Sequence, residues 1–196
     1  MSGLRIAIAD DELDMREYFA SVLPALGHTV VTVAADGREL VERCREARPE
    51  LIITDIKMPH LDGIDAAIEI CRDGPLPVIL VSGYYDAELI RRAEDDHALA
   101  YLLKPIDRAD LEPAIALAVR RFRELEALRH ETLSLRQALE ERKLVERAKG
   151  LIMRRTGLDE SAAFQRLQRL ASDRNLRLAE VARAILTAED AFFPER

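Results

Sequence analysis

Four short apolar runs in the first half of the chain each end in polar residues, and this pattern constrains the fold more than any other feature. Apolar runs of this length are typical of buried strands, and amphipathic segments lie between them. This alternation predicts an α/β fold in which helices cover both faces of a parallel sheet. Ligands bind outside the carboxyl ends of such strands, so we expect the polar residues to form one site. The runs are 4–9, 51–54, 78–81 and 100–103, and they end in Asp10 with Asp11, Asp55, Ser82 with Gly83, and Lys104 with Pro105.

The segments between these runs carry the signals of helices and of one further strand at 29–34. Gly27 and His28 form a turn before that strand, Asp36 and Gly37 mark the next turn, and Pro49 ends a helix. Five βα units are therefore predicted, which makes a doubly wound, five-stranded parallel sheet. The expected helices span about 14–26, 37–47, 63–72 and 87–95, and a fifth begins near 107.

A long helix is predicted after Pro113, because no proline follows before Pro194 and no glycine before Gly150. Up to about Val119 we expect this helix to pack on its own domain. Beyond Phe122 no sheet remains to be covered, so a partner helix is expected, from a second copy of the chain. The stripe that would face the partner has 3-4 spacing and comprises Leu111, Ala114, Ala118, Arg121, Leu125, Leu128, Thr132, Leu135 and Leu139.

The end of the chain is predicted to form a small three-helix, all-α domain. The long helix finishes near Met153, and Asp159 caps a second helix that reaches about Ala171. A polar loop at 172–177 then leads to a third helix at 178–189. Three short helices bury little area, so this unit should lean on the long helix or on a dimer partner. The predicted inner face of the second helix is Ala163, Phe164, Leu167, Leu170 and Ala171.

Composition excludes several classes of protein. The 196 residues are 48% hydrophobic and 33% charged, enough for one good core and a smaller second unit. No apolar run approaches the roughly 18 residues of a membrane span, and the first three residues lead directly into a strand, so no signal peptide is expected. Cys44 and Cys71 fall on apolar helix faces without metal-site spacing, which favours reduced core residues. We expect a soluble, cytoplasmic protein.

Three carboxylates at one sheet edge require a positive charge, because like charges held close together repel. Mg²⁺ fits best, since it prefers carboxylate oxygens and pairs with phosphate oxygens. Asp55 is then a candidate nucleophile that takes up a phosphoryl group as an acyl phosphate. Lys104 would neutralise the phosphoryl oxygens, and the Ser82 hydroxyl would donate a hydrogen bond to them. For each residue alone a simpler role stays open, since a strand-end Asp often caps a helix and a lone Lys is usually solvated.

Residues 1–120 resemble the receiver domain of response regulators, which act in two-component signal transduction. The resemblance implies a flavodoxin-like sheet, phosphorylation of Asp55 by a sensor histidine kinase, and a cis peptide bond before Pro105. It also implies that Asp11, Asp55 and the backbone carbonyl of Lys57 bind Mg²⁺, with Asp10 acting through water. The residues that carry the resemblance are Asp10, Asp11, Asp55, Met58, Pro59, Asp62, Gly63, Ser82, Gly83, Tyr101, Lys104 and Pro105.

The resemblance further implies that Ser82 and Tyr101 move together on phosphorylation. A half-buried edge aromatic is the alternative for Tyr101. Lys57, Tyr84 and Tyr85 depart from the commonest pattern and border the site, where they could change the lifetime of the phosphoryl group in either direction.

Residues from about 131 to 191 resemble the ANTAR family of RNA-binding antitermination domains. The resemblance implies a dimeric three-helix unit that binds RNA hairpin loops and prevents premature termination, and so acts on the transcription machinery indirectly. The predicted segments are a receiver domain at 1–120, a helical linker with a possible coiled coil at 121–142, and an ANTAR-like domain at 131–192 that overlaps the linker helix. The resemblance rests on 144–153 and on Ala163, Phe164, Leu167, Ala171, Val181, Ala182 and Ile185.

Charge is distributed unevenly along the chain. Residues 1–118 hold 12 basic and 23 acidic residues, whereas 142–183 hold 11 basic and 5 acidic residues, which suits a polyanion. Several of the basic residues alternate with glutamates, so ordinary helical ion pairs stay an open alternative. No Trp or Tyr follows Tyr101, so an aromatic stacking platform is not expected. The candidates for RNA contact are Arg147, Ala148, Lys149, Gly150, Arg154 and Arg155, where the small residues would permit close approach.

Two other functions compete with phosphorylation-controlled RNA binding by a dimer. A DNA-binding output with a helix-turn-helix is compatible with three terminal helices, but the predicted loop at 172–177 is long for that motif. A Mg²⁺-dependent phosphatase of the haloacid dehalogenase type would place an Asp-x-Asp motif in the first strand, whereas here the acidic pair comes first and a single Asp follows. We therefore expect a phospho-accepting regulator with no catalytic residues, and not an enzyme.

Overall fold

The computed structural model describes residues 3–83 and 98–192. Contacts divide the chain into two compact units, Met1–Glu126 and Ala127–Arg196. One helix, α5 (Arg108–Thr156), contributes residues to both units. The domain boundaries near 120 and 142 stay predictions. In the part of the chain that the structure describes, no helix is both long and apolar enough to cross a membrane.

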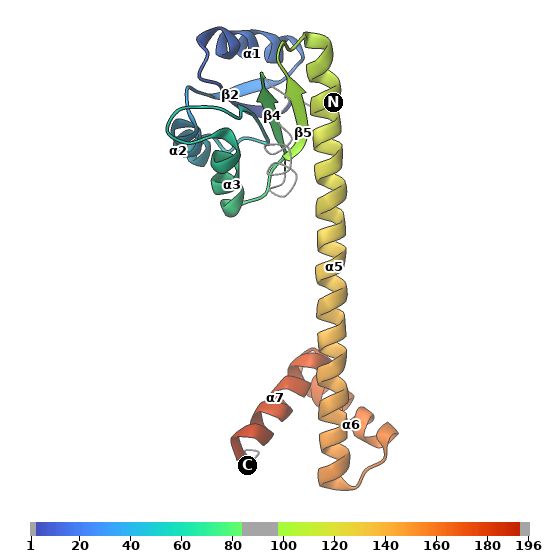
Figure 1. Ribbon diagram of the computed structural model, residues 1–196. Helices are drawn as coiled ribbons and strands as arrows, with labels where there is room; N and C mark the ends of the chain where they lie inside the picture. Colours follow the sequence, from blue (N-terminus) through green and yellow to red (C-terminus); the bar gives the residue numbers. More distant parts are fainter. Residues whose placement is uncertain (1–2, 84–97, 193–196) are drawn as a thin grey trace. The chain divides into compact units, whose positions relative to one another are not determined.

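The first unit is built on a five-stranded sheet in which all neighbouring strands are parallel. The strand order is β2-β1-β3-β4-β5, so the predicted doubly wound sheet is confirmed (Figure 1). The order reverses direction between β1 and β3, and ligands bind at such a switch point, outside the carboxyl ends of the strands. The strands are β1 (Arg5–Ala9), β2 (Thr29–Ala34), β3 (Leu51–Asp55), β4 (Val78–Ser82) and β5 (Ala98–Leu103).

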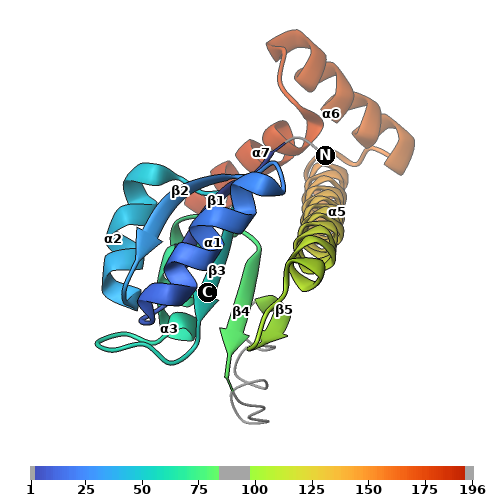
Figure 2. The ribbon, with the colours of Figure 1, turned by 90° about the horizontal axis from the view of Figure 1, so that it is seen from above.

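Helices cover both faces of this sheet (Figure 2). Side chains alternate between the two faces along each strand, so β1 sends Ile6 and Ile8 to one face and Ala7 and Ala9 to the other. The first face packs on α1 (Leu13–Ala25) and on the start of α5, and the second face packs on α2 (Gly37–Ala47) and α3 (Gly63–Asp73). The helix predicted at 87–95 lies outside the described residues.

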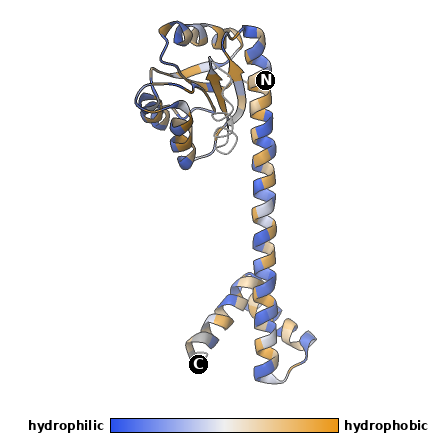
Figure 3. Cartoon of the chain, in the orientation of Figure 1, coloured by the Kyte–Doolittle hydropathy of each residue, from blue (hydrophilic) through white to orange (hydrophobic). Residues whose placement is uncertain are grey.

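The long helix predicted after Pro113 is confirmed, since α5 runs for 49 residues. Its first part packs on the sheet as expected, because Leu111 and Ala118 are fully buried. Further along, apolar residues recur among hydrophilic ones (Figure 3), and the leucines of the predicted stripe are exposed. Leu128 is 59% exposed and Leu135 is 64% exposed. The partner helix itself stays a prediction.

The second unit packs the end of α5 against α6 (Glu160–Arg174) and α7 (Leu178–Phe192). Asp159 caps α6 as predicted, because its side chain accepts a hydrogen bond from the backbone N–H of Ala162. Phe164, predicted on the inner face, is half-buried and is not part of the hydrophobic cluster of this unit. The buried members of the cluster are Ala148, Ile152, Ala163, Leu167, Ala171, Val181 and Ala182.

The prediction of a polar loop over residues 172–177 is wrong. α6 continues to Arg174, so only residues 175–177 connect it to α7. Asn175 ends the helix in the left-handed conformation (φ 52°), which Asn tolerates better than most residues. The polar residues at 172–174 mark an exposed last turn of the helix, and not its end. The connection is therefore short enough for a helix-turn-helix, and loop length no longer argues against that motif.

Candidate functional site

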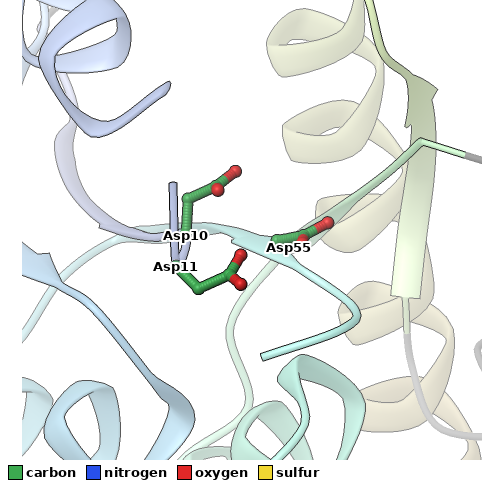
Figure 4. A group of neighbouring side chains, drawn as sticks. All are labelled: Asp10, Asp11 and Asp55. Atoms are coloured by element: carbon green, nitrogen blue, oxygen red, sulfur yellow. The ribbon is translucent and has the colours of Figure 1, made fainter. Parts of the chain in front are cut away.

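The predicted polar residues do gather at the carboxyl edge of the sheet, beside the switch point between β1 and β3. Asp10 and Asp11 follow β1, and Asp55 is the last residue of β3. Figure 4 shows their side chains projecting into the same region from these two strand ends. One carboxylate oxygen from each of the three residues lies within 4.8 Å of the others. Three acidic groups at this spacing form a candidate cation site.

Burial makes this site costly for negative charge. Asp10 is fully buried and Asp55 is 7% exposed. Burial raises the pKa of Asp55 to about 6, with Lys104 opposing the shift and Asp10 and Asp11 adding to it. Burial likewise raises the pKa of Asp10, against the effect of Lys104 and a backbone hydrogen bond from Glu12. A second positive charge would relieve this repulsion.

One oxygen of Asp10 points to the same conclusion. Its Oδ2 atom is buried and accepts no hydrogen bond, although the Lys104 ammonium lies 3.0 Å away as an ion-pair partner. That ammonium donates hydrogen bonds to Oδ1 of Asp10 and to Oε1 of Glu12. Buried carboxylate oxygens normally have a partner. Mg²⁺ prefers carboxylate oxygens as ligands, so the three carboxylates fit this ion. Lys57 lies in the exposed loop after β3, and its backbone carbonyl stays a predicted ligand.

Lys104 supplies the positive charge of the site. Its Nζ lies 2.9 Å from Oε1 of Glu12, 3.0 Å from Oδ2 of Asp10 and 3.8 Å from Oδ2 of Asp55. Burial would lower the pKa of Lys104, but hydrogen bonds to the first two carboxylates outweigh it and raise the pKa. The peptide bond between Lys104 and Pro105 is cis, as predicted. The ammonium is thus shared among three acids, and Asp55 is the most distant of them.

Two contributors to the site were missed in the sequence. Glu12 follows the acidic pair directly, but its position on the first turn before α1 gave no sign that it reaches Lys104. Arg16 on α1 donates hydrogen bonds to the backbone carbonyls of Asp10 and Asp11, at 2.7 and 2.9 Å. An arginine six residues after the first acid is a weak signal, because only the fold of the turn brings it back.

The backbone around Asp55 is tightly packed. The N–H of Gly63 donates to the carbonyl of Ile56 at 2.9 Å, which ties the start of α3 to the end of β3. A Cβ atom on Gly63 would lie 1.9 Å from the carbonyl oxygen of Asp55, so only glycine allows this approach. Asp62 caps α3 by accepting a hydrogen bond from the N–H of Asp65 at 2.8 Å.

The predicted switch residues lie on the neighbouring strands. Ser82 is buried as the last residue of β4, and its carbonyl accepts a hydrogen bond from the N–H of Lys104 at 2.8 Å. Tyr101 on β5 is half-buried and packs against the cluster on the α2 and α3 face. Tyr84 and Tyr85, which were predicted to border the site, lie outside the described residues. The coupled movement of Ser82 and Tyr101 stays a prediction.

The residues predicted to contact RNA do not share one environment in the second unit. Ala148 is fully buried in the cluster, and Gly150 is half-buried. Lys149 lies between Glu146 and Glu160, with Nζ–O distances of 2.6 and 2.7 Å. Arg147, Arg154 and Arg155 are all exposed, and Arg155 pairs with Glu189 through its Nε atom at 3.0 Å. The open alternative of helical ion pairs therefore holds for Lys149, which pairs with Glu146 on the same helix. Arg155 pairs instead with Glu189 of α7.

Comparisons with known proteins divide the chain in the same way. Residues 6–116 match the response regulator receiver domain, and residues 133–186 match the ANTAR domain. The transcriptional regulatory protein PdtaR of Mycobacterium tuberculosis is 45% identical over 182 residues, which cover 93% of this chain and 89% of that protein. The relationship thus extends over both units.

Solved structures of receiver domains are similar to part of this chain. A response regulator receiver domain protein of Clostridium thermocellum is 31% identical, with a TM-score of 0.57, and covers 64% of this chain and 99% of its own. The receiver domain of a modulated diguanylate cyclase of Desulfovibrio desulfuricans is 27% identical, with a TM-score of 0.59 and the same two coverages. These structures share the sheet that carries Asp10, Asp11 and Asp55.

Proposed function

The chain belongs to the two-component response regulators that join a receiver domain to an ANTAR domain, and we propose that phosphorylation of Asp55 controls the binding of RNA hairpins by its second unit. RNA binding would then prevent transcription termination and reach the transcription machinery indirectly. The regulator would work in the cytoplasm, as a phospho-acceptor and not as an enzyme with a substrate of its own.

The observation that carries this proposal is the gathering of three carboxylates around one shared ammonium at the switch point. In the proposed step, a carboxylate oxygen of Asp55 attacks the phosphorus of a phosphohistidine on a sensor kinase. The O–P bond forms as the P–N bond breaks, and the histidine leaves. Asp10, Asp11, Asp55 and the Lys57 carbonyl would hold Mg²⁺, which neutralises charge on the transferred phosphoryl group.

The Lys104 ammonium would move toward the phosphoryl group on Asp55. It lies nearer to Glu12 and Asp10 than to Asp55, so an acyl phosphate on Asp55 would draw the ammonium away from Glu12. Ser82 would donate its hydroxyl to the same group from the end of β4. Tyr101 would then repack on β5, the strand that precedes α5.

The exposed leucines of α5 support dimerisation as the output of this change. Leu125, Leu128, Leu135 and Leu139 are each at least 45% exposed and keep 3-4 spacing. A second copy of the helix would bury this stripe, as in a two-stranded coiled coil. A phosphorylated homodimer would present two output units to RNA, which raises avidity.

The proposal is tested by measuring size and RNA affinity together, with and without acetyl phosphate and Mg²⁺. The phosphorylated chain should become dimeric and should bind terminator-overlapping hairpins more tightly than RNA of arbitrary sequence. Asp55→Asn should respond to neither addition. An identical response from that variant would exclude control by Asp55.

Duplex DNA is the second candidate ligand, because the connection of three residues between α6 and α7 suits a helix-turn-helix. The match to the ANTAR domain favours RNA. Titration of duplex DNA and hairpin RNA at the same salt concentration distinguishes them, since affinity for nucleic acid depends strongly on salt. If the chain bound a specific DNA duplex more tightly than hairpin RNA, the RNA-binding proposal would be wrong and DNA would be the ligand.

A further inference from the structure

The basic residues of the second unit fall into two groups. Lys149 and Arg155 are held by glutamates, as described above. Arg166 and Arg169 on α6 are exposed and have neither an ion pair nor a hydrogen bond within the part of the chain that the structure describes. An arginine without an acidic partner keeps its full set of donors for a ligand. The arginines available for an anion thus include two on α6 that the sequence did not single out.

These two arginines border a surface groove. A hollow of about 440 Å³ is lined by Leu158, Arg166, Arg169 and Leu170, and an adjoining hollow of about 340 Å³ is lined by Arg166 and Leu170 again. Ile152 of α5 and Ile185 of α7 form the apolar floor of the second hollow. The α6 groove comprises both hollows and is defined by Ile152, Leu158, Arg166, Arg169, Leu170 and Ile185.

The charge around the groove suits a polyanion. Each hollow has one acidic residue in its lining, Asp173 in the first and Glu189 in the second. Glu189 is already neutralised by Arg155, which lines the same hollow. Arg166 stands where the two hollows meet and contributes to both. The groove therefore joins an apolar floor to a cationic rim.

We propose that the α6 groove holds unstacked bases of an RNA hairpin loop, with Arg166 and Arg169 contacting the bases and their phosphates. The apolar floor suits the faces of bases, and a planar guanidinium can stack on a base or bind a phosphate through two hydrogen bonds. Bases in a duplex are stacked and cannot enter, so the groove selects loops, where proteins read RNA sequence. Arginine planes here serve where Trp or Tyr, neither of which occurs after Tyr101, would otherwise stack on the bases. The inference rests on the proposed RNA-binding function.

The test uses the full chain, phosphorylated with acetyl phosphate and Mg²⁺. The probe is a hairpin selected on the wild-type chain from a library with one fixed stem and a randomised loop. The double variant Arg166→Gln with Arg169→Gln should lose about tenfold or more in affinity. Arg174→Gln with Arg183→Gln removes the same charge outside the groove and should lose less than about threefold. Arg166→Lys keeps the positive charge but loses the planar guanidinium, so this variant should retain only part of the wild-type affinity for the hairpin.

A second measurement locates the contact directly. 4-Thiouridine placed in the selected loop should crosslink to peptides that contain Arg166 or Leu170. Wild-type affinity in the groove variant, or crosslinks confined to the face of Arg147 and Arg154, would overturn the groove while leaving RNA binding intact. Failure of the wild-type chain to bind any selected hairpin better than arbitrary RNA would overturn the proposed function as well. If the groove bound a protein instead, and the variants kept their RNA affinity, the proposal that the groove binds RNA would be overturned.

Discussion

At the scale of single residues, the site is defined by two acids, Asp10 and Asp55, that are buried before any cation or phosphoryl group arrives. Asp55 shows this best, because burial raises its pKa from 3.8 to about 6. The folded protein therefore binds this proton more tightly than the unfolded chain does. The stability that the neutral carboxyl contributes is fully present below about pH 4 and is lost as pH rises through about 6.

Asp55→Asn should remove the loss of folding stability that accompanies ionisation of the Asp55 carboxyl group. Without divalent cations at about pH 8, the variant should be more stable than the wild type by about 3 kcal/mol, and the difference should vanish near pH 4. Urea unfolding over this pH range measures it. Glu17→Gln, at an exposed position on α1, is the matched control and should show no such pH dependence. A constant difference at every pH would contradict the assignment to burial of the charge.

Glu12→Gln tests how the Lys104 ammonium is shared. The Glu12 carboxylate lies 2.9 Å from Nζ of Lys104 and is 62% exposed, so the pair is weak but competes with the phosphoryl group. Its loss should raise the steady-state fraction of phosphorylated chain formed from acetyl phosphate about two- to fivefold. A phosphate-affinity gel reads this fraction, with Glu17→Gln again as the control. An unchanged or lower fraction would show that Glu12 does not compete.

At the scale of elements, the junction between β3 and α3 holds Asp55 in place by close backbone packing. Gly63→Ala would put a Cβ atom 1.9 Å from the Asp55 carbonyl oxygen, so the strand end or the helix must shift. We expect a loss of about 1–3 kcal/mol in the free energy of unfolding, as in overpacked cores, and slower phosphorylation. Gly74→Ala, where the added Cβ atom would meet no heavy atom within 4 Å apart from its neighbours in the chain, should change neither. Equal effects of the two substitutions in urea unfolding would refute this.

The leucine stripe of α5 is the second feature at this scale. Leu128→Glu with Leu135→Glu should abolish dimerisation of the phosphorylated chain, because both residues occupy the same position of successive heptads. Both are exposed in one chain, so its stability should hardly change. Leu133→Glu is the matched control, since Leu133 is 62% exposed but lies off the stripe. Light scattering after size exclusion measures the mass, and a persisting dimer in the double variant would place the interface elsewhere.

At the scale of the whole molecule, one uninterrupted helix contributes to both units. α5 begins four residues after Lys104 and ends at Thr156 in the second unit. A signal that starts at the site can therefore reach the output along one element, provided that the helix stays intact. No proline or glycine interrupts this helix between Pro113 and Gly150.

Gln137→Pro should break this connection. Proline inside a helix costs about 3 kcal/mol and removes a backbone donor. Phosphorylation of Asp55 should persist, while RNA affinity should no longer respond to it. Gln137→Ala keeps the helix and should preserve the response. A normal response in the proline variant, measured by band shift with and without acetyl phosphate, would mean that the units communicate by another route.

Much of the fold and of the first site could be predicted because both depend on local pattern. Strand ends in a parallel sheet meet at one edge, so the positions of Asp10, Asp55 and Lys104 in the sequence were enough to predict that these residues lie close together. The end of α6 could not be predicted in this way, because polar residues mark exposure as well as loops. Contacts between elements, such as that of Lys149 with Glu160, depend on how helices pack.

The sequence by itself thus determined the order of strands and helices, the length of α5 and the identity of the acidic site, since hydrophobic period and chain breakers are local properties. Only the tertiary structure decided which charges are already paired. It assigned Glu12 to Lys104, Glu160 to Lys149 and Glu189 to Arg155, and left Arg166 and Arg169 open beside a groove. Pairing between different segments is settled by the distances between their side chains, and no spacing along one segment reports those distances.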